Sequence, residues 1–434
     1  MIESTLTIVS LLMIMQSIFT IFGMIYAWND NENIVDNKSP TKFTDPYHSF
    51  TVLLPAWQEE EVIADTIQAV SDLNYPDELK EILVLLRPQD PETIAVAERK
   101  IKELNKENIR LILVDDKPQN KSNQLNHGLK VATGQIMTVF DAEDQPHRDI
   151  LNVVNTTMIN RNLDVVQCGV QLMNFRSNWF ATLNVLEYYF WFKSVLLMFS
   201  KVGIMPLGGN TVFVRKDYMK SVGGWDETCL TEDAALGISL SLRGAKMAVI
   251  YDEIHATQEE VPHDTVSFIK QRTRWNQGFM QILMRGEYFK LRSLKKIALI
   301  LYVLIWPQVQ TLFFLYLLLA ITVFPFLKLN VMTSMITIFP VYLLILQWVL
   351  LAVGLYEFSK SYSKKYPWYM PIKIVATFFP YQVVMGICSV RALYRNLMKN
   401  NAWEKTKHIN AHRQEEAEEI KVKTGEAIKL RPVN

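Results

Sequence analysis

Four stretches of the chain are poor in charged side chains, and a long polar stretch separates the first from the other three. The hydrophobic stretches are residues 5–28, 297–327, 331–356 and 372–394. Each is long enough to cross a membrane as a helix, because about 20 apolar residues span the core of a bilayer. The polar stretch, residues 48–290, is long enough for one large domain. The hydrophobic pattern therefore predicts a multi-pass membrane protein with one polar domain.

The polar stretch alternates between short hydrophobic runs and amphipathic segments. The runs predict strands at residues 50–56, 81–86, 110–114 and 135–140. The amphipathic segments predict helices at residues 59–73, 91–104 and 122–132. Strands that alternate with helices build a mainly parallel sheet with helices on both faces. The expected fold class is therefore α/β, with ligands bound at the carboxyl ends of the strands.

Positive charges predict the side of the membrane on which the polar domain lies. The N-terminal transmembrane helix (residues 1–30) has no Lys or Arg before it, whereas Lys38 and Lys42 follow it closely. Short segments rich in Lys and Arg tend to stay in the cytoplasm. We therefore expect the N-terminus to lie outside the cell membrane and the 48–290 domain to be cytoplasmic.

The C-terminal hydrophobic region (residues 295–396) allows two arrangements. If its last stretch, residues 372–394, crossed the membrane in full, the C-terminal tail (residues 397–434) would lie outside. The tail is basic, which favours the cytoplasm. We therefore expect either that residues 372–394 form a re-entrant or interfacial helix, or that residues 297–327 contain a second crossing.

Composition and charge argue against several classes of protein. The chain has 45 Lys and Arg against 44 Asp and Glu, a formal net charge of +1, which gives no sign of a nucleic-acid partner. Its three cysteines are far apart and lack the spacing of a zinc site, which is consistent with a reducing compartment. The chain contains neither the glycine pattern of a dinucleotide-binding fold nor that of a P-loop.

The first four predicted strands end in acidic residues. These ends are at Glu59, Asp90, Asp115 and Asp141. One acidic residue after a strand is ordinary turn or helix-capping chemistry. Four on one edge of a sheet would repel one another unless a cation or a donor-rich ligand lies between them. Oxygen ligands suit Mg²⁺ or Mn²⁺, so the set predicts a divalent cation that holds a diphosphate.

Four motifs follow one another along the polar stretch. They are TVLLPAWQEE (residues 51–60), FDAEDQP (140–146), GGWD followed by TED (223–233) and QRTRW (271–275). In this order, between hydrophobic helices, they resemble the family-2 glycosyltransferases of the cellulose synthase and hyaluronan synthase kind. The resemblance covers about residues 48–290. It implies a GT-A fold and the transfer of a sugar from a nucleotide-sugar, with inversion at the anomeric carbon.

The resemblance implies residues for the nucleotide-sugar donor and for a metal. The expected donor-binding residues are Asp90, Lys121, Asp141 and Arg274. For Lys121, a solvated loop lysine is the alternative. Asp141 would also hold Mg²⁺ or Mn²⁺. The sequence departs from the family's DxD pattern here, because Glu143 and Asp144 both follow Asp141, and either could complete the metal site. The expected donor is a UDP-sugar.

The TED motif contains the expected catalytic base. An inverting transferase needs a carboxylate that takes the proton from the acceptor hydroxyl. Asp233 is our candidate, and Glu232 is the alternative base. Both open an amphipathic helix, whose N-terminal NH groups can fix a carboxylate. A helix cap without a catalytic role is the competing interpretation.

The acceptor is expected to bind beside the QRTRW motif. Trp275 suits a platform on which a sugar ring stacks, and Gln271 suits contacts with hydroxyl groups. Gly209 and Asn210 belong to a further family-like element near the acceptor. The alternative for Trp275 and its neighbouring arginines is an interfacial position beside the bilayer.

The leading hypothesis is a membrane-embedded glycosyltransferase that extends a polysaccharide. A glycolipid synthase that adds one sugar to a lipid is the first alternative, and a catalytically inactive membrane scaffold is the second. Export of a polymer through so few helices would need an oligomer or a partner subunit. The tail motif WEKTKH (residues 403–408) resembles the ending of bacterial relatives. The sugar, the acceptor and the linkage stay open.

Overall fold

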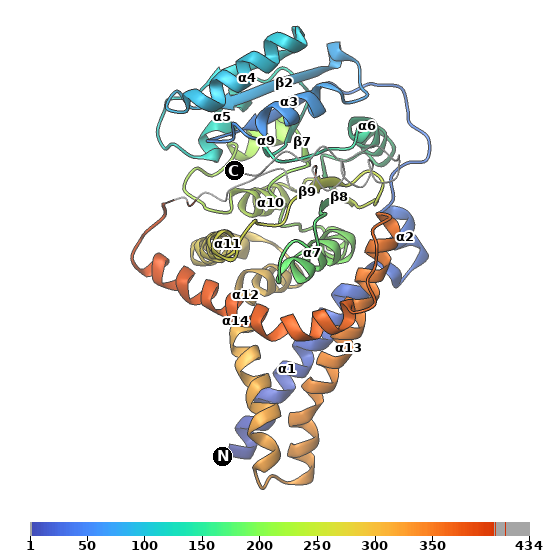
Figure 1. The fold of residues 1–434 in the computed structure, drawn as a ribbon, viewed down its shortest axis with the longest axis vertical. Helices are drawn as coiled ribbons and strands as arrows, with labels where there is room; N and C mark the ends of the chain where they lie inside the picture. Colours follow the sequence, from blue (N-terminus) through green and yellow to red (C-terminus); the bar gives the residue numbers. More distant parts are fainter. Residues whose placement is uncertain (1, 403, 405–412, 414–434) are drawn as a thin grey trace, which may run out of the picture.

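The computed structural model describes residues 2–402, 404 and 413. It consists of a head, which contains the sheet, and a stalk of long helices (Figure 1). The strands are β1 (Phe50–Pro55), β2 (Lys80–Leu86), β3 (Ile109–Leu113), β4 (Ile136–Val139), β5 (Val165–Cys168), β6 (Val170–Leu172), β7 (Val212–Arg215), β8 (Met247–Ile250) and β9 (Thr257–Glu259). The helices are α1 (Ile2–Ile25), α2 (Asn31–Asp36), α3 (Ile63–Ser71), α4 (Pro91–Leu104), α5 (Lys121–Val131), α6 (Ile150–Arg161), α7 (Ala181–Phe190), α8 (Leu196–Val202), α9 (Lys216–Val222), α10 (Glu232–Leu242), α11 (Thr265–Arg285), α12 (Leu294–Thr322), α13 (Val331–Ser361) and α14 (Met370–Leu397).

The main sheet has the strand order β3-β2-β1-β4-β7-β5-β8. Neighbouring strands are parallel except at β7, which runs antiparallel to β4 and β5. The first four strands lie where the hydrophobic pattern placed them, which confirms the predicted mainly parallel α/β sheet. Helix α3 begins at Ile63 rather than Glu59, because the chain first turns at Gln58, whose φ is 56°. Strands β6 and β9 form a separate parallel pair.

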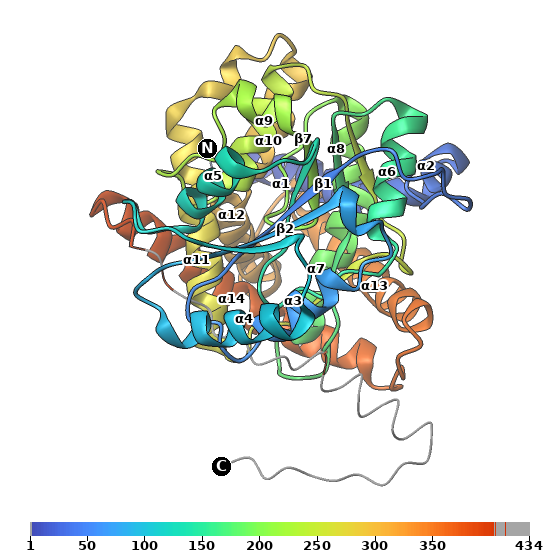
Figure 2. The ribbon, with the colours of Figure 1, turned by 90° about the horizontal axis from the view of Figure 1, so that it is seen from above.

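Alternating side chains of the strands point into two separate cores. Phe50, Val52 and Leu54 of β1 belong to one core, together with residues of α3, α4 and α6. Leu53 belongs to the other core, together with residues of α5, α7 and α14. Seen from above, α3 and α4 lie on one side of β2 and α5 on the other (Figure 2). The sheet is therefore covered on both faces, as is usual for parallel strands.

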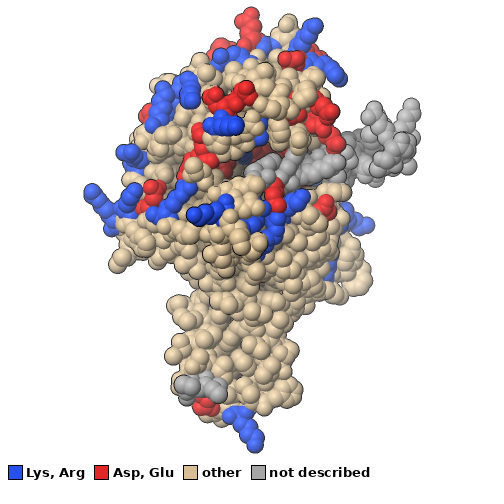
Figure 3. Space-filling model, turned by 90° about the vertical axis from the view of Figure 1, so that its left-hand side faces the viewer, with Lys and Arg blue, Asp and Glu red and all other residues tan. Residues whose placement is uncertain are grey.

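Four helices of the described chain are long and apolar enough to cross a membrane: α1, α12, α13 and α14. Three of them, α1, α12 and α13, run along the stalk, whereas α14 lies across its top beneath α11 (Figure 1). Helix α12 is continuous although Pro307 lies within it. On the face seen in Figure 3, charged side chains gather on the head and at the tip of the stalk and leave the middle of the stalk uncharged. This distribution matches a helical bundle that faces lipid.

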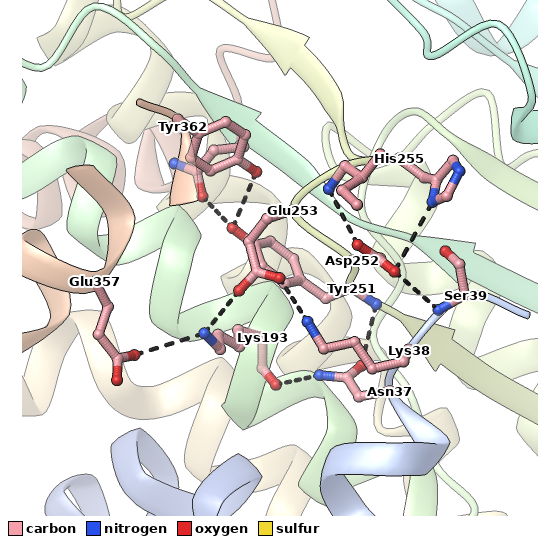
Figure 4. Close-up of polar contacts among 12 residues, drawn as sticks. Asn37, Lys38, Ser39, Lys193, Tyr251, Asp252, Glu253, His255, Glu357 and Tyr362 are labelled. Carbon is pink, nitrogen blue, oxygen red and sulfur yellow. Dashed lines mark hydrogen bonds and ion pairs between the residues drawn. The ribbon is translucent and has the colours of Figure 1, made fainter. Parts of the chain in front are cut away.

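A polar network joins the stalk to the head (Figure 4). Lys193, just after α7, pairs with Glu253 of the β8–β9 loop (2.8 Å) and with Glu357 of α13 (3.6 Å). Lys38 also pairs with Glu253 (2.7 Å), and the Asn37 side chain donates a hydrogen bond to the Lys193 carbonyl (2.6 Å). The chain after α1 and the end of α13 are thus tied to the same region of the head.

Candidate active site

One cavity of about 560 Å³ begins at the carboxyl ends of β1 and β4 and continues between the apolar helices. Its head side includes Trp57, Asp141 and Asp233. Its stalk side includes Phe19 of α1 and Trp306 of α12. The edge at which parallel sheets bind ligands is therefore connected directly to the stalk.

The loop after β4 carries three carboxylates in different surroundings. Asp144 is fully buried and accepts hydrogen bonds from the Asp141 amide (2.7 Å) and from Asn210 Nδ2 (2.7 and 2.9 Å). Burial, followed by the charges of Asp141, Glu259 and Glu143, raises the pKa of Asp144 well above its usual value. Asp141 and Glu143 line the cavity instead. Asp144, held by Asn210, thus fixes the backbone of the loop, and the carboxylates of Asp141 and Glu143 are left at the cavity.

These side chains fit a divalent cation such as Mg²⁺ or Mn²⁺. Ions of this kind prefer carboxylate oxygens, and Asp141, Glu143 and Glu259 line the same cavity. After burial, their charges are the next cause of the raised pKa of Asp144, and a cation among them would relieve this repulsion. Asp141 and Glu143 are the pair of this loop that could hold an ion, with Asp144 behind them.

Lys121 begins α5 and lies beside the same loop. Its ammonium group pairs with Asp141 and donates a hydrogen bond to the Gly209 carbonyl (3.4 Å). Burial acts to lower the pKa of Lys121, but the charges of Asp141 and Glu232 outweigh it and hold the pKa above its usual value. Lys121 is therefore a fixed positive charge on the cavity wall.

Glu232 and Asp233 open α10, and both line the cavity. Burial and the charge of Asp233 raise the pKa of Glu232 to about 7. Burial also raises the pKa of Asp233, while the Ala234 amide donates a hydrogen bond to its Oδ1 (2.8 Å). Gly209 lies against this carboxylate, because a Cβ at Gly209 would stand 3.3 Å from Asp233 Oδ2. The pair can accept a proton close to neutral pH, next to Lys121.

The QRTRW residues lie on α11, and four of them line the cavity: Gln271, Arg272, Arg274 and Trp275. The Gln271 Oε1 atom is buried and has no hydrogen-bond partner among the described residues. The Arg272 guanidinium lies 4.5 Å from the Trp275 ring centroid and pairs with Glu187 of α7. The Tyr188 ring is 6.3 Å from that of Trp275. An aromatic wall with an unused amide oxygen suits a sugar ring and its hydroxyl groups.

The sequence did not predict that Arg272 pairs with Glu187. Glu187 belongs to no recognised motif and precedes Arg272 by 85 positions. Only the fold brings α7 and α11 together. The pair fixes the cation above Trp275, so it sets the position of the expected acceptor platform.

Asp90, expected to contact the nucleotide, caps α4 and is not among the residues that line the cavity. Its carboxylate accepts hydrogen bonds from the amides of Gln58 and Thr93 and is buried. The wall in front of it contains Trp57 and Arg87, whose guanidinium lies 4.7 Å from the Trp57 ring centroid. Asp90 thus orders the loop that carries Trp57. In the sequence, the only indication of this part of the wall was Trp57 of the TVLLPAWQEE motif.

The four acidic strand ends do not all meet. Glu59 and Asp141 line the cavity, because they follow β1 and β4, which are neighbours in the middle of the sheet. Asp115 follows β3 at the edge of the sheet, where it accepts a hydrogen bond from Gln89 (2.6 Å). The expected convergence on the cavity therefore holds for the ends of β1 and β4, whereas Asp90 after β2 and Asp115 after β3 do not line it.

The expected tail motif at residues 403–408 lies outside the described residues apart from Glu404. Glu404 pairs with Arg391 near the end of α14 (2.6 Å). Arg413 is also described, and its guanidinium donates a hydrogen bond to the Asp144 carbonyl (2.6 Å). One residue of the tail thus reaches the loop that carries the three carboxylates.

Comparison with known proteins agrees with these features. The sequence model of the family described as Glycosyltransferase like family 2 matches residues 46–278. The poly-beta-1,6-N-acetyl-D-glucosamine synthase of Staphylococcus aureus (strain COL) is 28% identical over 314 residues, which cover 70% of this chain and 72% of that protein. The probable glycosyltransferase YdaM of Bacillus subtilis (strain 168) is 25% identical over 252 residues, 56% of this chain and 58% of that protein.

A solved structure shows the same fold. It is the mannosyltransferase PcManGT from Pyrobaculum calidifontis in complex with GDP-Man and Mn2+. The TM-score is 0.56 at 14% sequence identity, and the match covers 91% of this chain and 99% of that chain. This likeness confirms the expected GT-A fold.

Proposed function

Because this chain belongs to the glycosyltransferase-like family 2, we propose that it extends a polysaccharide from a nucleotide-sugar at the surface of a membrane. The observation that carries the proposal is the cavity that holds Asp141, Asp233 and Trp275 and continues between α1 and α12. A growing polymer needs such a continuation to leave the site past the helices. The similar Staphylococcus aureus synthase supports N-acetylglucosamine as the sugar and UDP-N-acetylglucosamine as the first donor to test.

The proposed reaction is a single displacement, in which an acceptor that is stacked on Trp275 attacks the donor sugar with Asp233 as the base. Asp233 takes the proton from an acceptor hydroxyl, and the hydroxyl oxygen forms a bond to the anomeric carbon of the donor. The bond from that carbon to the diphosphate breaks, and the nucleoside diphosphate leaves with the electron pair. One displacement of this kind inverts the configuration. Glu232, at the neighbouring position, can share the proton before it passes to solvent.

Fixed charges around the cavity would stabilise the leaving group. Lys121 and Arg274 line the cavity and can donate hydrogen bonds to the diphosphate. Asp141 and Glu143 would hold Mg²⁺ or Mn²⁺, and a bound ion of this kind neutralises diphosphate oxygens. The Mn2+ and GDP-Man bound to the mannosyltransferase from Pyrobaculum calidifontis support a divalent ion beside a nucleotide-sugar. Asp144 keeps the loop in the required shape through its bond from the Asp141 amide.

A donor screen on membranes tests the proposed function. Membranes that contain the chain are incubated with radiolabelled UDP-N-acetylglucosamine, UDP-glucose or GDP-mannose, in the presence of Mg²⁺ or Mn²⁺. We expect label from UDP-N-acetylglucosamine in a product of polymer size. Label that enters only the lipid extract would favour the glycolipid synthase. Donor binding without any transfer would favour the inactive scaffold.

A pair of variants checks the assignment of the metal. Asp141→Ala removes a carboxylate from the cavity, and metal-dependent transfer should be lost. Asp115→Ala removes an exposed carboxylate from the end of the edge strand β3 and should transfer at the wild-type rate. Wild-type transfer by Asp141→Ala in excess metal would contradict the role of Asp141.

A further inference from the structure

Two loops on the side of the head bring two histidines and two aspartates together. His147 and Asp149 lie between β4 and α6, and Asp252 and His255 lie between β8 and β9. One potential ligand atom each of His147, Asp149 and His255 lies within 4.8 Å of the other two. The three side chains are partly buried, with 33%, 29% and 14% of their surface exposed, respectively. None of the four residues lines the cavity described above.

We infer that His147, Asp149 and His255 bind a divalent transition-metal ion of the Zn²⁺ type. Two imidazole nitrogens and one carboxylate oxygen are a ligand set that zinc accepts, with a fourth position left for water. Mg²⁺ prefers oxygen ligands alone, as the carboxylates of the cavity offer them. The ligand set of this cluster therefore differs in chemistry from the carboxylates of the cavity. The inference does not rest on the proposed function, because it concerns other residues and another kind of ion.

Polar side chains lie next to the ligands. Asp252 Oδ2 lies 3.8 Å from His255 Nδ1, a buried nitrogen that has no hydrogen-bond partner among the described residues. Figure 4 shows the Asp252 carboxylate between His255 and the Ser39 amide, which donates a hydrogen bond to it (3.3 Å). Asn74 Nδ2 donates a hydrogen bond to Asp149 Oδ1 (2.8 Å), so Oδ2 can face the ion. Histidines and carboxylates that bind metals are usually oriented by partners of this type.

His147 faces the other two ligands across the space that the ion would fill. Its Nδ1 lies 4.0 Å from Asp149 Oδ2 and accepts a hydrogen bond from the Asp149 amide (3.2 Å). Its ring meets the His255 ring edge to face, with 4.7 Å between the centroids. An ion bound by the three side chains would replace that one long hydrogen bond with a coordinate bond.

The position of the site gives the ion a structural role. The loop of His147 also carries Glu143, and the loop of His255 leads into β9, which carries Glu259. The two segments already meet through two backbone hydrogen bonds between Gln145 and Gln258 (3.0 Å each). An ion that binds only the folded state stabilises it by mass action. The metal would therefore stabilise the junction that supports two acidic residues of the cavity.

Zinc binding by the full-length protein in detergent tests the inference. The protein is stripped with EDTA, desalted and titrated with Zn²⁺, and bound zinc and the melting temperature are measured. We expect one tightly bound zinc per chain and a higher melting temperature with zinc. Asp141→Asn changes the cavity, and His263→Ala removes an exposed histidine. Both variants should keep the bound zinc and the rise in melting temperature.

Substitutions in the cluster should abolish this behaviour. His147→Ala and His255→Ala should each lose the bound zinc and the zinc-dependent rise in melting temperature. Asp252→Asn keeps both histidines and should weaken zinc binding by roughly 10- to 100-fold. Retention of zinc by both histidine variants would overturn the site, as would its loss in Asp141→Asn. If the histidine variants do not fold, unchanged zinc affinity of Asp252→Asn would overturn it instead.

Discussion

Two adjacent carboxylates, Glu232 and Asp233, share a small space beside Lys121. Burial raises both pKa values, and for Glu232 the charge of Asp233 adds to the effect. Carboxylates that interact this closely do not lose their protons independently. The pair can therefore take up one proton in the pH range in which a general base is most effective.

Substitution of Asp233 should separate transfer from donor binding. Asp233→Asn keeps the shape of the side chain but removes the base, so transfer should fall by roughly 10²–10⁴-fold. Donor affinity, measured by calorimetry, should change little. Asp217→Asn, at an exposed position of α9, is the matched control and should leave both quantities unchanged. Equal loss of binding and transfer would show that Asp233 only caps α10. A rate above about a tenth of wild type would point to Glu232 as the base.

The pH dependence of transfer should report the coupling between the two carboxylates. A base must be unprotonated, so kcat/KM should fall as the pH drops through its pKa. Glu232→Gln removes a negative neighbour, which makes Asp233 easier to deprotonate and should move the acid limb to lower pH. Profiles of kcat/KM against pH for the wild type and the variant test this. An acid limb that stays in place would mean that Glu232 has no influence on the base.

Helix α11 connects the proposed catalytic carboxylates, the proposed acceptor platform and the stalk. Gly278 packs against Thr231, directly before the carboxylate pair, and Arg272 holds Trp275. Farther along the helix, the Gln277 side chain accepts a hydrogen bond from Arg395 of α14 (3.0 Å). One rigid element therefore sets the relative positions of groups that come from separate parts of the chain.

A side chain at Gly278 should disturb the start of α10. A Cβ there would stand 2.6 Å from Thr231 Cγ2 and 2.8 Å from the Thr231 amide nitrogen, closer than packed atoms allow. We expect Gly278→Ala to cost about 1–3 kcal/mol of stability, seen as a lower melting temperature, and to reduce transfer further by shifting Asp233. Val266→Ala, at a position of α11 that is 60% exposed, should alter neither. A Gly278→Ala protein with wild-type melting and transfer would show that the contact relaxes freely.

The arrangement of the helices supports a single orientation in the membrane. The side chain of Glu3, near the N-terminus, accepts hydrogen bonds from the amide (3.0 Å) and side chain (2.9 Å) of Asn330, in the connection between α12 and α13. Both therefore lie at the tip of the stalk, opposite the head. Because α14 lies across the top of the stalk, we propose that α1, α12 and α13 cross the membrane, which would leave the head and the end of α14 on one side. We propose that this side is the cytoplasm and that export of a polymer needs an oligomer or a partner subunit.

Cysteine accessibility in intact cells should distinguish the two sides. Lys328→Cys, at the tip of the stalk, should react with a membrane-impermeant reagent. Lys365→Cys, between α13 and α14, should react only after the cells are permeabilised. The three native cysteines are buried, so their background reaction should be low. Reaction of Lys365→Cys in intact cells would reverse the proposed orientation.

Much of this protein is determined by local sequence. The first four strands follow from short hydrophobic runs, and the apolar helices follow from long ones, because each pattern records burial on a particular type of element. The motifs led to Asp141, Asp233 and Trp275, and the family resemblance led to Lys121; the structure brings all four to one cavity. The first three could be found because each lies in a short motif whose chemistry is recognisable without its neighbours in space.

Other features depend on contacts between distant segments, which a local pattern does not contain. Asp144 turns inward because Asn210 is there to donate hydrogen bonds to it, and this leaves Glu143 on the cavity wall. Likewise, α14 is apolar enough to cross a membrane, yet it lies along α11 because that helix offers it a packing surface. His147 and His255 meet only because β9 returns beside the loop after β4. In each case the deciding energy comes from burial and hydrogen bonding between elements that are far apart in the chain.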